Sequence, residues 1–253
     1  MKFELRHRVL FSDVGADFKV TLGTMLRLFQ NVAAAHSESI GFGIRTLSER
    51  SIYWMLSKLW IEVTRYAYYG EELVITSWSR GANGFKMPRD FEIHVGGERV
   101  AAGSSIWFVV NTRHRKVERV PAEIDAAYLT ESIHALSQDL GEWSPYERFD
   151  TTNRWIAQTR HSDLDAGGHV NNTVYVEYLL SSLVVQQGAD PHIPSLKLQF
   201  NREIGPNVAE VFVETAETSG KLLFKISDGQ QQVYARGELV LTDHSVRSRW
   251  DNA

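Results

Sequence analysis

The sequence predicts an α+β protein made of two similar units, each with one long helix packed on an antiparallel sheet. Three observations support this fold class. A helical period precedes a series of short strand-like segments in the first half, the same order returns in the second half, and the segments just before the two long helices align directly. The 253 residues, at roughly 150 per domain, allow one to two domains.

The first half is predicted to be one helix followed by several strands. Apolar residues recur at helical spacing between Thr21 and Ile40, and Gly41 stands where a C-terminal cap belongs. Beyond this helix, Gly96-Gly97 lies between two strand-like segments and indicates a hairpin. The predicted strands span residues 58–64, 73–78, 91–95 and 99–110.

The second half repeats this order after a connecting segment. Residues 122–140 are compatible with an amphipathic helix that ends at Gly141. A second long helix is predicted to follow Asn171-Asn172 and to run through Val185. Strands are then predicted over 196–200, 211–213, 221–226 and 233–241, the last two paired across Asp228-Gly229. We therefore divide the chain into an N-terminal unit at 1–125, a connector at 126–150 and a C-terminal unit at 151–253.

Direct alignment of the halves supports a duplication. An offset of 150 places Ser12–Ala16 on Ser162–Ala166, just before each long helix. A shorter offset of 137 places Arg65 on Arg202, which is consistent with a longer helix-to-strand segment in the first half. The sequence therefore predicts that the two units share one frame.

Composition excludes several classes of protein. With 43% hydrophobic and 23% charged residues, the chain is an ordinary globular one rather than a disordered or membrane-spanning one. The formal charge of −4 gives no overall basic field for nucleic acid. Because there is no cysteine, disulfides, thiolate metal sites and a cysteine nucleophile are excluded. Charges within residues 1–8 interrupt the apolar run that a signal peptide needs, so we expect a cytoplasmic protein.

The two halves differ most where polar groups gather before the second helix. Gly15 and Lys19 of the first half are replaced by Asp165 and His169 in the second. One interpretation is structural: residues 165–168 form a turn, and Asn171 is the helix N-cap. The other is a site, because paired glycines admit a substrate to the backbone, helix N-terminal N–H groups stabilise an oxyanion, and a carboxylate with an imidazole moves protons. Such a site suits hydrolysis of an acyl compound or hydration of an enoyl compound.

The run from His161 to Tyr175 resembles the motif of plant and bacterial acyl-ACP thioesterases, which are tandem hotdog-fold proteins. The motif of that family reads Asp-Leu-Asp-x-Asn-x-His-Val-Asn-Asn. The resemblance spans roughly residues 5 to 242. In the first half it rests on Leu28–His36, Trp54, Arg65-Tyr66, Gly70-Glu71, Thr76–Trp78, Arg89 and Trp107. The resemblance implies a double hotdog fold and hydrolysis of fatty acyl-ACP by water attack on the thioester.

The resemblance also implies which residues act. The family's catalytic aspartate, histidine and glutamate fall on Asp165, His169 and Glu203. Backbone N–H groups around Gly168 and His169 are expected to polarise the thioester carbonyl. The residues expected to contact substrate are Gly167, Gly168, Asn171 and Trp54. The N-terminal unit, which lacks the polar set, is expected to hold the acyl chain. Two residues depart from the pattern: Gly167 replaces the motif asparagine, and Ile204 replaces the cysteine that follows the glutamate in plant members.

Several alternatives stay open. Glu203 could be a solvated strand-end carboxylate paired with Arg202, and His36 on the first helix is expected to be a core histidine whose hydrogen bonds are satisfied. The chain could instead be an acyl-CoA thioesterase, a non-catalytic acyl-thioester-binding module or an enoyl-thioester hydratase. The basic run 113–116 is by default a solvated loop, but it could dock an acidic carrier or the phosphates of coenzyme A. We expect no cofactor and no metal, no nucleic-acid or membrane partner, an acyl carrier protein as partner, and leave open a homodimer formed through sheet edges.

Overall fold

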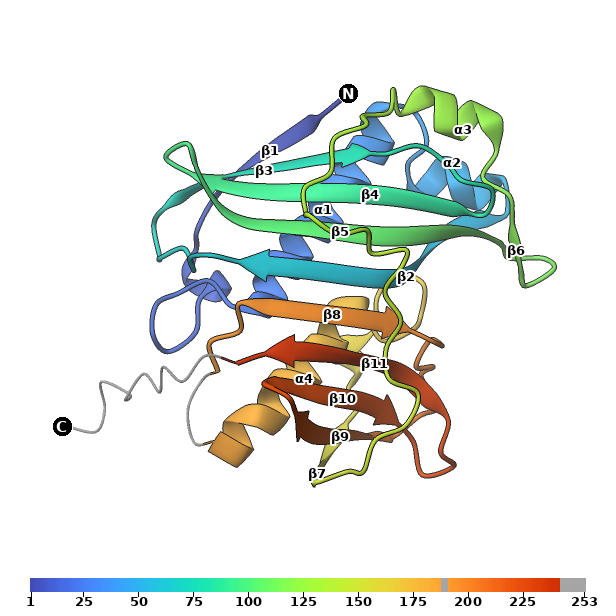
Figure 1. Cartoon of the computed structure of the whole chain (residues 1–253). Helices are drawn as coiled ribbons and strands as arrows, with labels where there is room; N and C mark the ends of the chain where they lie inside the picture. Colours follow the sequence, from blue (N-terminus) through green and yellow to red (C-terminus); the bar gives the residue numbers. More distant parts are fainter. Residues whose placement is uncertain (188–190, 242–253) are drawn as a thin grey trace. The chain divides into compact units, whose positions relative to one another are not determined.

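The computed structural model describes residues 1–187 and 191–241 and divides the chain into two compact units, Met1–Trp143 and Ser144–Ala253 (Figure 1). The division falls inside the segment that the sequence suggests as a connector. Each unit is a hotdog unit in which one long helix packs on an antiparallel sheet, so the predicted α+β class is confirmed. Within the described residues, no helix is long and apolar enough to span a bilayer.

Unit 1 packs the helix α1 (Leu22–Ser39) on a sheet whose strands run in the order β1-β3-β4-β5-β2. These strands are β1 (Phe3–Arg8), β2 (Ile52–Val63), β3 (Glu72–Ser79), β4 (Lys86–Val95) and β5 (Glu98–Asn111). The short β6 (Lys116–Glu118) pairs with β5. The smaller helices are η1 (Phe11–Asp13), α2 (Ile44–Glu49) and α3 (Ala122–Ala127).

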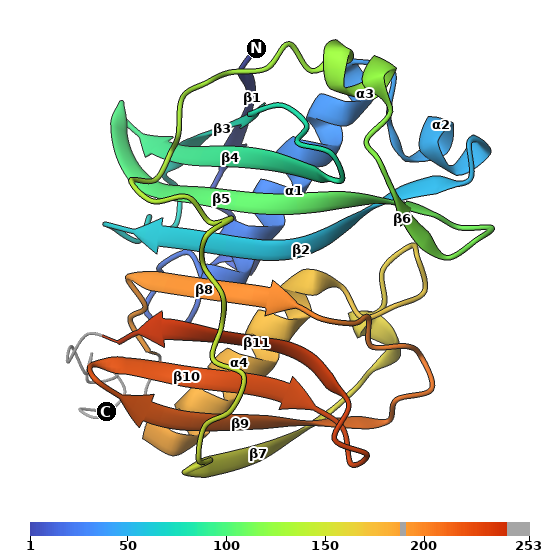
Figure 2. The same ribbon diagram turned by 45° about the vertical axis from the view of Figure 1, so that its right-hand side comes forward.

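Unit 2 repeats this arrangement around the helix α4 (Asn172–Gln187) (Figure 2). Its strands are β7 (Asn153–Gln158), β8 (Ser195–Phe200), β9 (Glu210–Thr218), β10 (Lys221–Ser227) and β11 (Val233–Val240), and the short helix η2 (His161–Asp163) follows β7. The strands run in the order β7-β9-β10-β11-β8, which matches unit 1 strand for strand. α1 contacts β1 and β3, and α4 contacts the equivalent β7 and β9. The predicted duplication is therefore confirmed at the level of topology.

The first helix begins and ends where the sequence predicts. Thr21 is the N-cap, and its side chain accepts a hydrogen bond from the N–H of Thr24 at 3.1 Å. At the other end Gly41 adopts a φ of +82°, and the N–H groups of Gly41 and Phe42 donate to the carbonyls of Glu38 and Ser37. This pair of bonds is the Schellman arrangement, which glycine permits because it has no Cβ.

β5 and β11, the fourth strands in the sheet order of their units, each carry a glycine at the equivalent position. A Cβ at Gly103 in β5 would lie 2.5 Å from Phe29 Cε2 and 3.1 Å from the carbonyl oxygen of Trp60. A Cβ at Gly237 in β11 would lie 2.1 Å from the carbonyl oxygen of Lys197. Both glycines therefore permit a close approach that any larger residue would prevent. The prediction of a shared frame holds for packing as well as for strand order.

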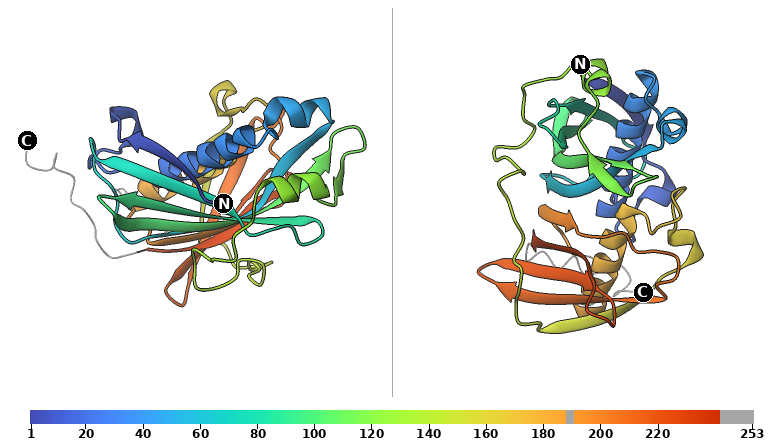
Figure 3. Two further views of the ribbon diagram at one scale, coloured as in Figure 1. Left: turned by 90° about the horizontal axis from the view of Figure 1, so that it is seen from above. Right: turned by 90° about the vertical axis from the view of Figure 1, so that its right-hand side faces the viewer.

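The helix predicted over 122–140 is wrong beyond its first turns, because α3 ends at Ala127. Leu129 has a φ of +46°, which a continuing helix does not allow. The following residues run along the face of the unit 1 sheet opposite α1 (Figure 3). There Ala135, Leu136 and Leu140 pack with the buried Trp60 and Trp78.

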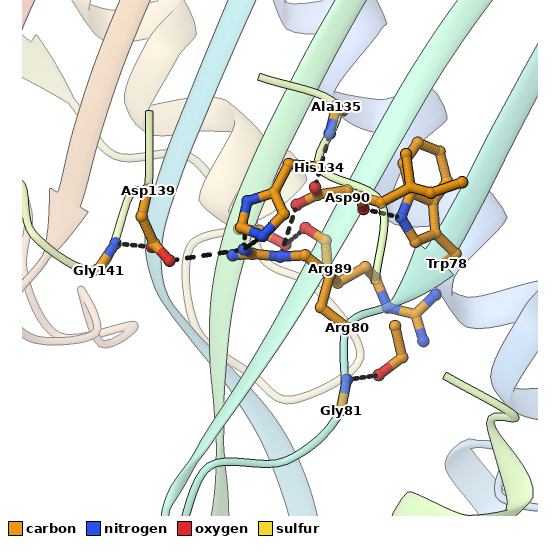
Figure 4. A network of polar contacts seen from close by, with 12 residues as sticks. Trp78, Arg80, Gly81, Arg89, Asp90, His134, Ala135, Asp139 and Gly141 are labelled. Atoms are coloured by element: carbon orange, nitrogen blue, oxygen red, sulfur yellow. Dashed lines mark hydrogen bonds and ion pairs between the residues drawn. The ribbon is translucent and has the colours of Figure 1, made fainter. Parts of the chain in front are cut away.

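Polar contacts hold this segment on the sheet (Figure 4). The indole N–H of Trp78 donates to the carbonyl of Ile133 at 2.8 Å, and the N–H of Ala135 donates to Asp90 Oδ2 at 2.8 Å. Arg80 lies 3.3 Å from Asp90 and 3.5 Å from Asp139, and burial raises the pKa of Asp90 above its usual range. Contacts with the sheet therefore outweigh the helical preference of the amphipathic pattern.

The short outer elements have no counterpart among the elements that the sequence predicts. They are β1 and β7, together with α2, β6 and the two 3-10 turns. β1 exposes every second residue, so its alternation is a usable signal, but a segment of six residues rich in charge gives that signal little weight. These elements gain most of their stability from a neighbouring strand, which local sequence does not specify.

Candidate active site

The candidate site is built on the loop that leads from η2 into α4 in unit 2. Asp163 fixes its start: its Oδ2 accepts from the N–H of Arg160 at 2.8 Å and from the hydroxyl of Tyr178 at 2.7 Å. Its carbonyl accepts from the N–H of Asn171 at 2.8 Å, which closes the loop. The loop is thus a defined structure whose residues 165–168 project from a fixed base.

Residues 165–168 form the predicted turn. The N–H of Gly168 donates to the carbonyl of Asp165 at 3.0 Å, and Gly168 has a φ of +79°. The Asp165 carboxylate accepts from the N–H of Gly167 at 2.8 Å, and the N–H of Asp165 donates to the carbonyl of His169 at 2.9 Å. Asp165 therefore reaches His169 through the main chain, and its carboxylate folds back on the turn.

Gly167 leaves room for this fold-back. A Cβ at Gly167 would lie 3.1 Å from Asp165 Oδ1, which is tighter than ordinary packing. Its φ lies outside the left-handed region, so the conformation itself accepts a side chain. The replacement of the motif asparagine by glycine thus changes what lies beside Asp165 rather than the path of the backbone.

The segment after β8 brings Glu203 to His169. The N–H of Val170 donates to the carbonyl of Ile204 at 2.9 Å, which joins the loop to this segment. Glu203 Oε2 then lies 3.5 Å from His169 Nε2. The two side chains are 41% and 42% exposed, so water reaches both. The distance exceeds that of an ordinary hydrogen bond, as is common for catalytic pairs without substrate.

This geometry bears on the alternative interpretation of Glu203 as a plain strand-end carboxylate. Its carboxylate lies within ion-pair distance of the His169 ring, so it faces the loop of the predicted motif. Two of the three side chains that the resemblance assigns to catalysis, His169 and Glu203, are thus brought together. The third, Asp165, lies at the start of the same turn.

One expectation about the backbone donors needs correction. We expected N–H groups around Gly168 and His169 to polarise a substrate carbonyl, but the N–H of Gly168 is already used within the turn. Within the described part of the chain, the N–H of His169 has no hydrogen-bond acceptor. Of the N–H groups of Gly167, Gly168 and His169, only that of His169 is therefore available within the described structure.

The other predicted binding residues have different surroundings. Asn171 is the helix N-cap, because its Oδ1 accepts from both the N–H and the hydroxyl of Thr173 at 2.9 Å. Trp54 lies in unit 1, where it packs beside Leu47 and Ile52, and its buried indole N–H has no partner among the described residues. Neither observation tests a contact with substrate.

His36 lies in the core of unit 1, but its hydrogen bonds are only half satisfied. Nδ1 lies 3.3 Å from Arg89, whereas Nε2 has no partner in the described chain. Burial, followed by the positive charge of Arg89, lowers the pKa of His36 to about 4. His36 is therefore neutral near pH 7.

The described residues contain no cluster of three or more histidine and acidic side chains suited to a metal.

Tyr175 is a residue of the site that the sequence patterns do not reveal. It is buried in α4, and its hydroxyl accepts from the N–H of Ile204 at 2.9 Å and lies 3.3 Å from the carbonyl of Arg202. One phenol thus holds the backbone on both sides of Glu203. Burial raises the pKa of Tyr175 well above its usual range, so the hydroxyl stays protonated. From its position in the helix, Tyr175 is predicted only to lie in the core. Its hydrogen bonds join segments 27 residues or more apart, so local sequence does not predict them.

Comparisons with known proteins agree with this arrangement. The model of the acyl-ACP thioesterase N-terminal domain matches residues 1–128, and that of the acyl-ACP thioesterase C-terminal domain matches residues 146–246. The chloroplastic acyl-[acyl-carrier-protein] hydrolase FATB3 of Cuphea viscosissima is 29% identical over 214 residues, or 76% of this chain and 49% of the relative. The chloroplastic palmitoyl-acyl carrier protein thioesterase of Arabidopsis thaliana is 25% identical over 89% of this chain and 61% of the relative. The chain thus spans about half to three-fifths of these curated relatives.

Solved structures share the fold. The 12:0-ACP thioesterase from Umbellularia californica superposes with a TM-score of 0.82 at 22% identity, over 95% of this chain and 97% of that one. An acyl-ACP thioesterase from Bacteroides thetaiotaomicron gives a TM-score of 0.81 at 19% identity, over 95% and 98%. Together the two family models cover most of the sequence. The chain belongs to the acyl-ACP thioesterase family.

Proposed function

We propose that this chain hydrolyses fatty acyl-ACP to a free fatty acid and the carrier protein. The observation that carries the proposal is the His169–Glu203 pair, 3.5 Å apart and open to water, beside the unused N–H of His169. A base, a water-orienting imidazole and an oxyanion donor are the groups that hydrolysis of a thioester requires. The names of the relatives support the carrier-bound substrate.

The proposed reaction needs no further reactant than water. Glu203 accepts a proton from water as the water oxygen bonds to the thioester carbonyl carbon. The carbonyl oxygen becomes an oxyanion and accepts a hydrogen bond from the N–H of His169, while the His169 ring holds the water against Glu203. When the intermediate collapses, the carbon–sulfur bond breaks, and the leaving thiolate takes the proton from Glu203. With a thiol pKa of about 8.5, the leaving group needs little help.

Replacing Glu203 tests the proposal. Glu203→Gln keeps the shape of the side chain but removes the base, and we expect hydrolysis of acyl-ACP to fall by about 10²- to 10⁴-fold. The matched control is Glu210→Gln, an exposed carboxylate at the start of β9 that accepts from Gln158 at 3.1 Å. Its turnover should equal that of the unaltered chain, and the circular dichroism of both variants should be unchanged. Equal turnover in Glu203→Gln and Glu210→Gln contradicts the assignment.

The same assays separate the alternatives. Matched acyl-ACP and acyl-CoA substrates show which carrier is preferred, and an enoyl thioester tests for hydration. Tight binding of an acyl thioester with no hydrolysis identifies a binding module instead. The cytoplasmic location and the homodimer stay predictions, to be checked by cell fractionation and by light scattering of the purified chain.

A further inference from the structure

A group of cationic side chains gathers at one end of the unit 1 sheet, where β4 begins and β5 turns into β6. We call it the basic hairpin surface. Its members are Lys86, Arg113, His114, Arg115, Lys116 and Arg119, all of them exposed. The strand register brings them together, because Lys86 pairs with Phe108 and Lys116 pairs with Asn111.

The lysines and arginines of this surface differ from the other surface cations of unit 1 in their surroundings. Elsewhere in unit 1, surface cations pair with carboxylates, for example Arg65 with Glu71 at 3.0 Å and Arg50 with Glu123 at 3.1 Å. Over residues 1–187 and 191–241, no lysine or arginine of the basic hairpin surface forms an ion pair. The acid within the hairpin, Glu118, accepts from the side chain of Asn111 at 3.0 Å. The positive charge of this surface is therefore not neutralised within the described chain.

Hydrogen bonds hold the start of the turn and the side chain of Arg113 in place. Asn111 Oδ1 accepts from the N–H groups of Arg113 at 2.9 Å and His114 at 3.1 Å, and Arg113 Nε donates to the hydroxyl of Ser51 at 2.8 Å. A solvated loop does not require such anchoring. A surface that must match a partner gains from it, because less side-chain freedom is lost on binding.

Apolar side chains lie within the same surface. Phe85 and Val117 are 45% and 41% exposed, and the guanidinium of Arg119 lies 5.4 Å from the centre of the Phe85 ring. Exposed aromatic residues with arginine are typical of protein interfaces rather than of plain solvated faces. The chain as a whole carries a formal charge of −4, so this local positive surface stands against the overall field.

We propose that the basic hairpin surface binds an acidic face of the acyl carrier protein. The proposal rests on the proposed function, which supplies a protein-borne substrate, and on charge complementarity, which fits a negatively charged folded partner. Attraction between opposite charges speeds encounter and weakens with salt. The surface recognises the carrier, while the groups of unit 2 act on the thioester.

Charge reversal tests the surface independently of hydrolysis. Arg113→Glu, Arg115→Glu and Lys116→Glu are combined, and the dissociation constant for acyl-ACP is measured in the Glu203→Gln background by biolayer interferometry. We expect it to rise by about 10- to 100-fold at low salt, and the difference to shrink at about 0.5 M salt, where the screening length falls to roughly 4 Å. The matched control combines Arg6→Glu, Arg8→Glu and Arg45→Glu, exposed residues of unit 1 with the same change in net charge. This control triple variant should have the same dissociation constant for acyl-ACP as Glu203→Gln alone.

Small thioesters complete the design. With Glu203 intact, the hairpin triple variant should retain its turnover of an acyl-N-acetylcysteamine, which has no carrier and no phosphate. Unchanged acyl-ACP affinity, or an equal loss in the control triple variant, overturns the proposal. An equal loss of affinity for acyl-CoA overturns it too, because it would assign the surface to phosphates. If no thioester is hydrolysed, the proposed function fails, while the binding measurement still decides on the surface.

Discussion

Loop 11–21 of unit 1 and loop 161–171 of unit 2 share several main-chain hydrogen bonds but differ in side-chain chemistry. In unit 1, the N–H of Gly15 donates to the carbonyl of Lys19, and the N–H of Thr21 donates to the carbonyl of Asp13. In unit 2, the N–H of Asp165 donates to the carbonyl of His169, and the N–H of Asn171 donates to the carbonyl of Asp163. The N–H of Val20 donates to the carbonyl of Ala67, and the N–H of Val170 donates to the carbonyl of Ile204. The two acceptors are related by the offset of 137.

The side chains of unit 1 satisfy one another. The Asp17 carboxylate accepts from the N–H of Lys19 at 3.0 Å and lies 3.4 Å from its ammonium group. In unit 2, the equivalent Gly167 has no side chain, so within the described residues the N–H of His169 stays unused. Glu203 stands where unit 1 has Tyr66. One frame therefore gives a closed turn in unit 1 and a turn with available chemical groups in unit 2.

The largest expected difference between the loops concerns position 169. His169→Ala should lower kcat for acyl-ACP by about 10²- to 10⁴-fold, because it removes the group that holds water against Glu203. The equivalent Lys19→Ala should change kcat by no more than about twofold, as for an ordinary surface position. Steady-state kinetics of both variants check this. A similar loss in both would show that the loops act through stability alone.

A second test replaces Tyr175 in α4 by the residue that α1 has at the equivalent position. Met25 stands at the position of Tyr175 and provides no hydroxyl for the segment after the sheet strand. Tyr175→Met should leave the buried N–H of Ile204 without a partner, which costs about 1–3 kcal/mol, and should lower kcat about 10- to 100-fold as Glu203 loses its position.

The ratio of kcat to KM effects distinguishes positioning from stability. KM should change little in Tyr175→Met, and Tyr175→Phe should behave alike because it lacks the same hydroxyl. Tyr234→Phe is the control, since it loses a phenol bond of 2.8 Å to Asp228 in the β10–β11 turn. A lower melting temperature with unchanged kcat in both Tyr175 variants would contradict the positioning role.

Closing the turn of unit 2 should have a smaller effect. Gly167→Asp introduces the carboxylate that Asp17 supplies in unit 1, where it captures the N–H of residue 19. We expect kcat to fall by roughly 10-fold, less than the roughly 10²- to 10³-fold loss when such a donor is deleted, because the introduced carboxylate competes for the N–H without removing it. Gly167→Ala adds the Cβ alone and serves as the steric control. If Gly167→Asp is as active as Gly167→Ala, the N–H of His169 is not the donor.

The smallest expected effect concerns backbone strain at one shared position. Phe18 and Gly168 have φ values of +60° and +79°. Gly168→Ala should destabilise the fold by about 1 kcal/mol, whereas Phe18→Gly should stabilise it by up to about 1 kcal/mol, because only glycine adopts this region without cost. Urea unfolding measures both. Effects of the same sign would show that the two turns are not equivalent.

Much of the fold followed from the sequence, because its patterns are local. The bounds of α1 came from the helical period with Thr21 and Gly41 at its ends, and the hairpin at Gly96-Gly97 came from its turn residues. The duplication came from the matching runs at 12–16 and 162–166. The sequence also points to His169 and Glu203, through the resemblance of their surroundings to the acyl-ACP thioesterase family.

The tertiary structure decided what depends on contacts between distant segments. The helix predicted over 122–140 gave way to a segment held by Trp78 and Asp90. The role of Tyr175 depends on Ile204 lying against α4, and the N–H of His169 is available because no acceptor among the described residues reaches it. Local pattern specifies which residues share a helix or strand face, whereas the choice among partners depends on which groups the fold brings within hydrogen-bond distance.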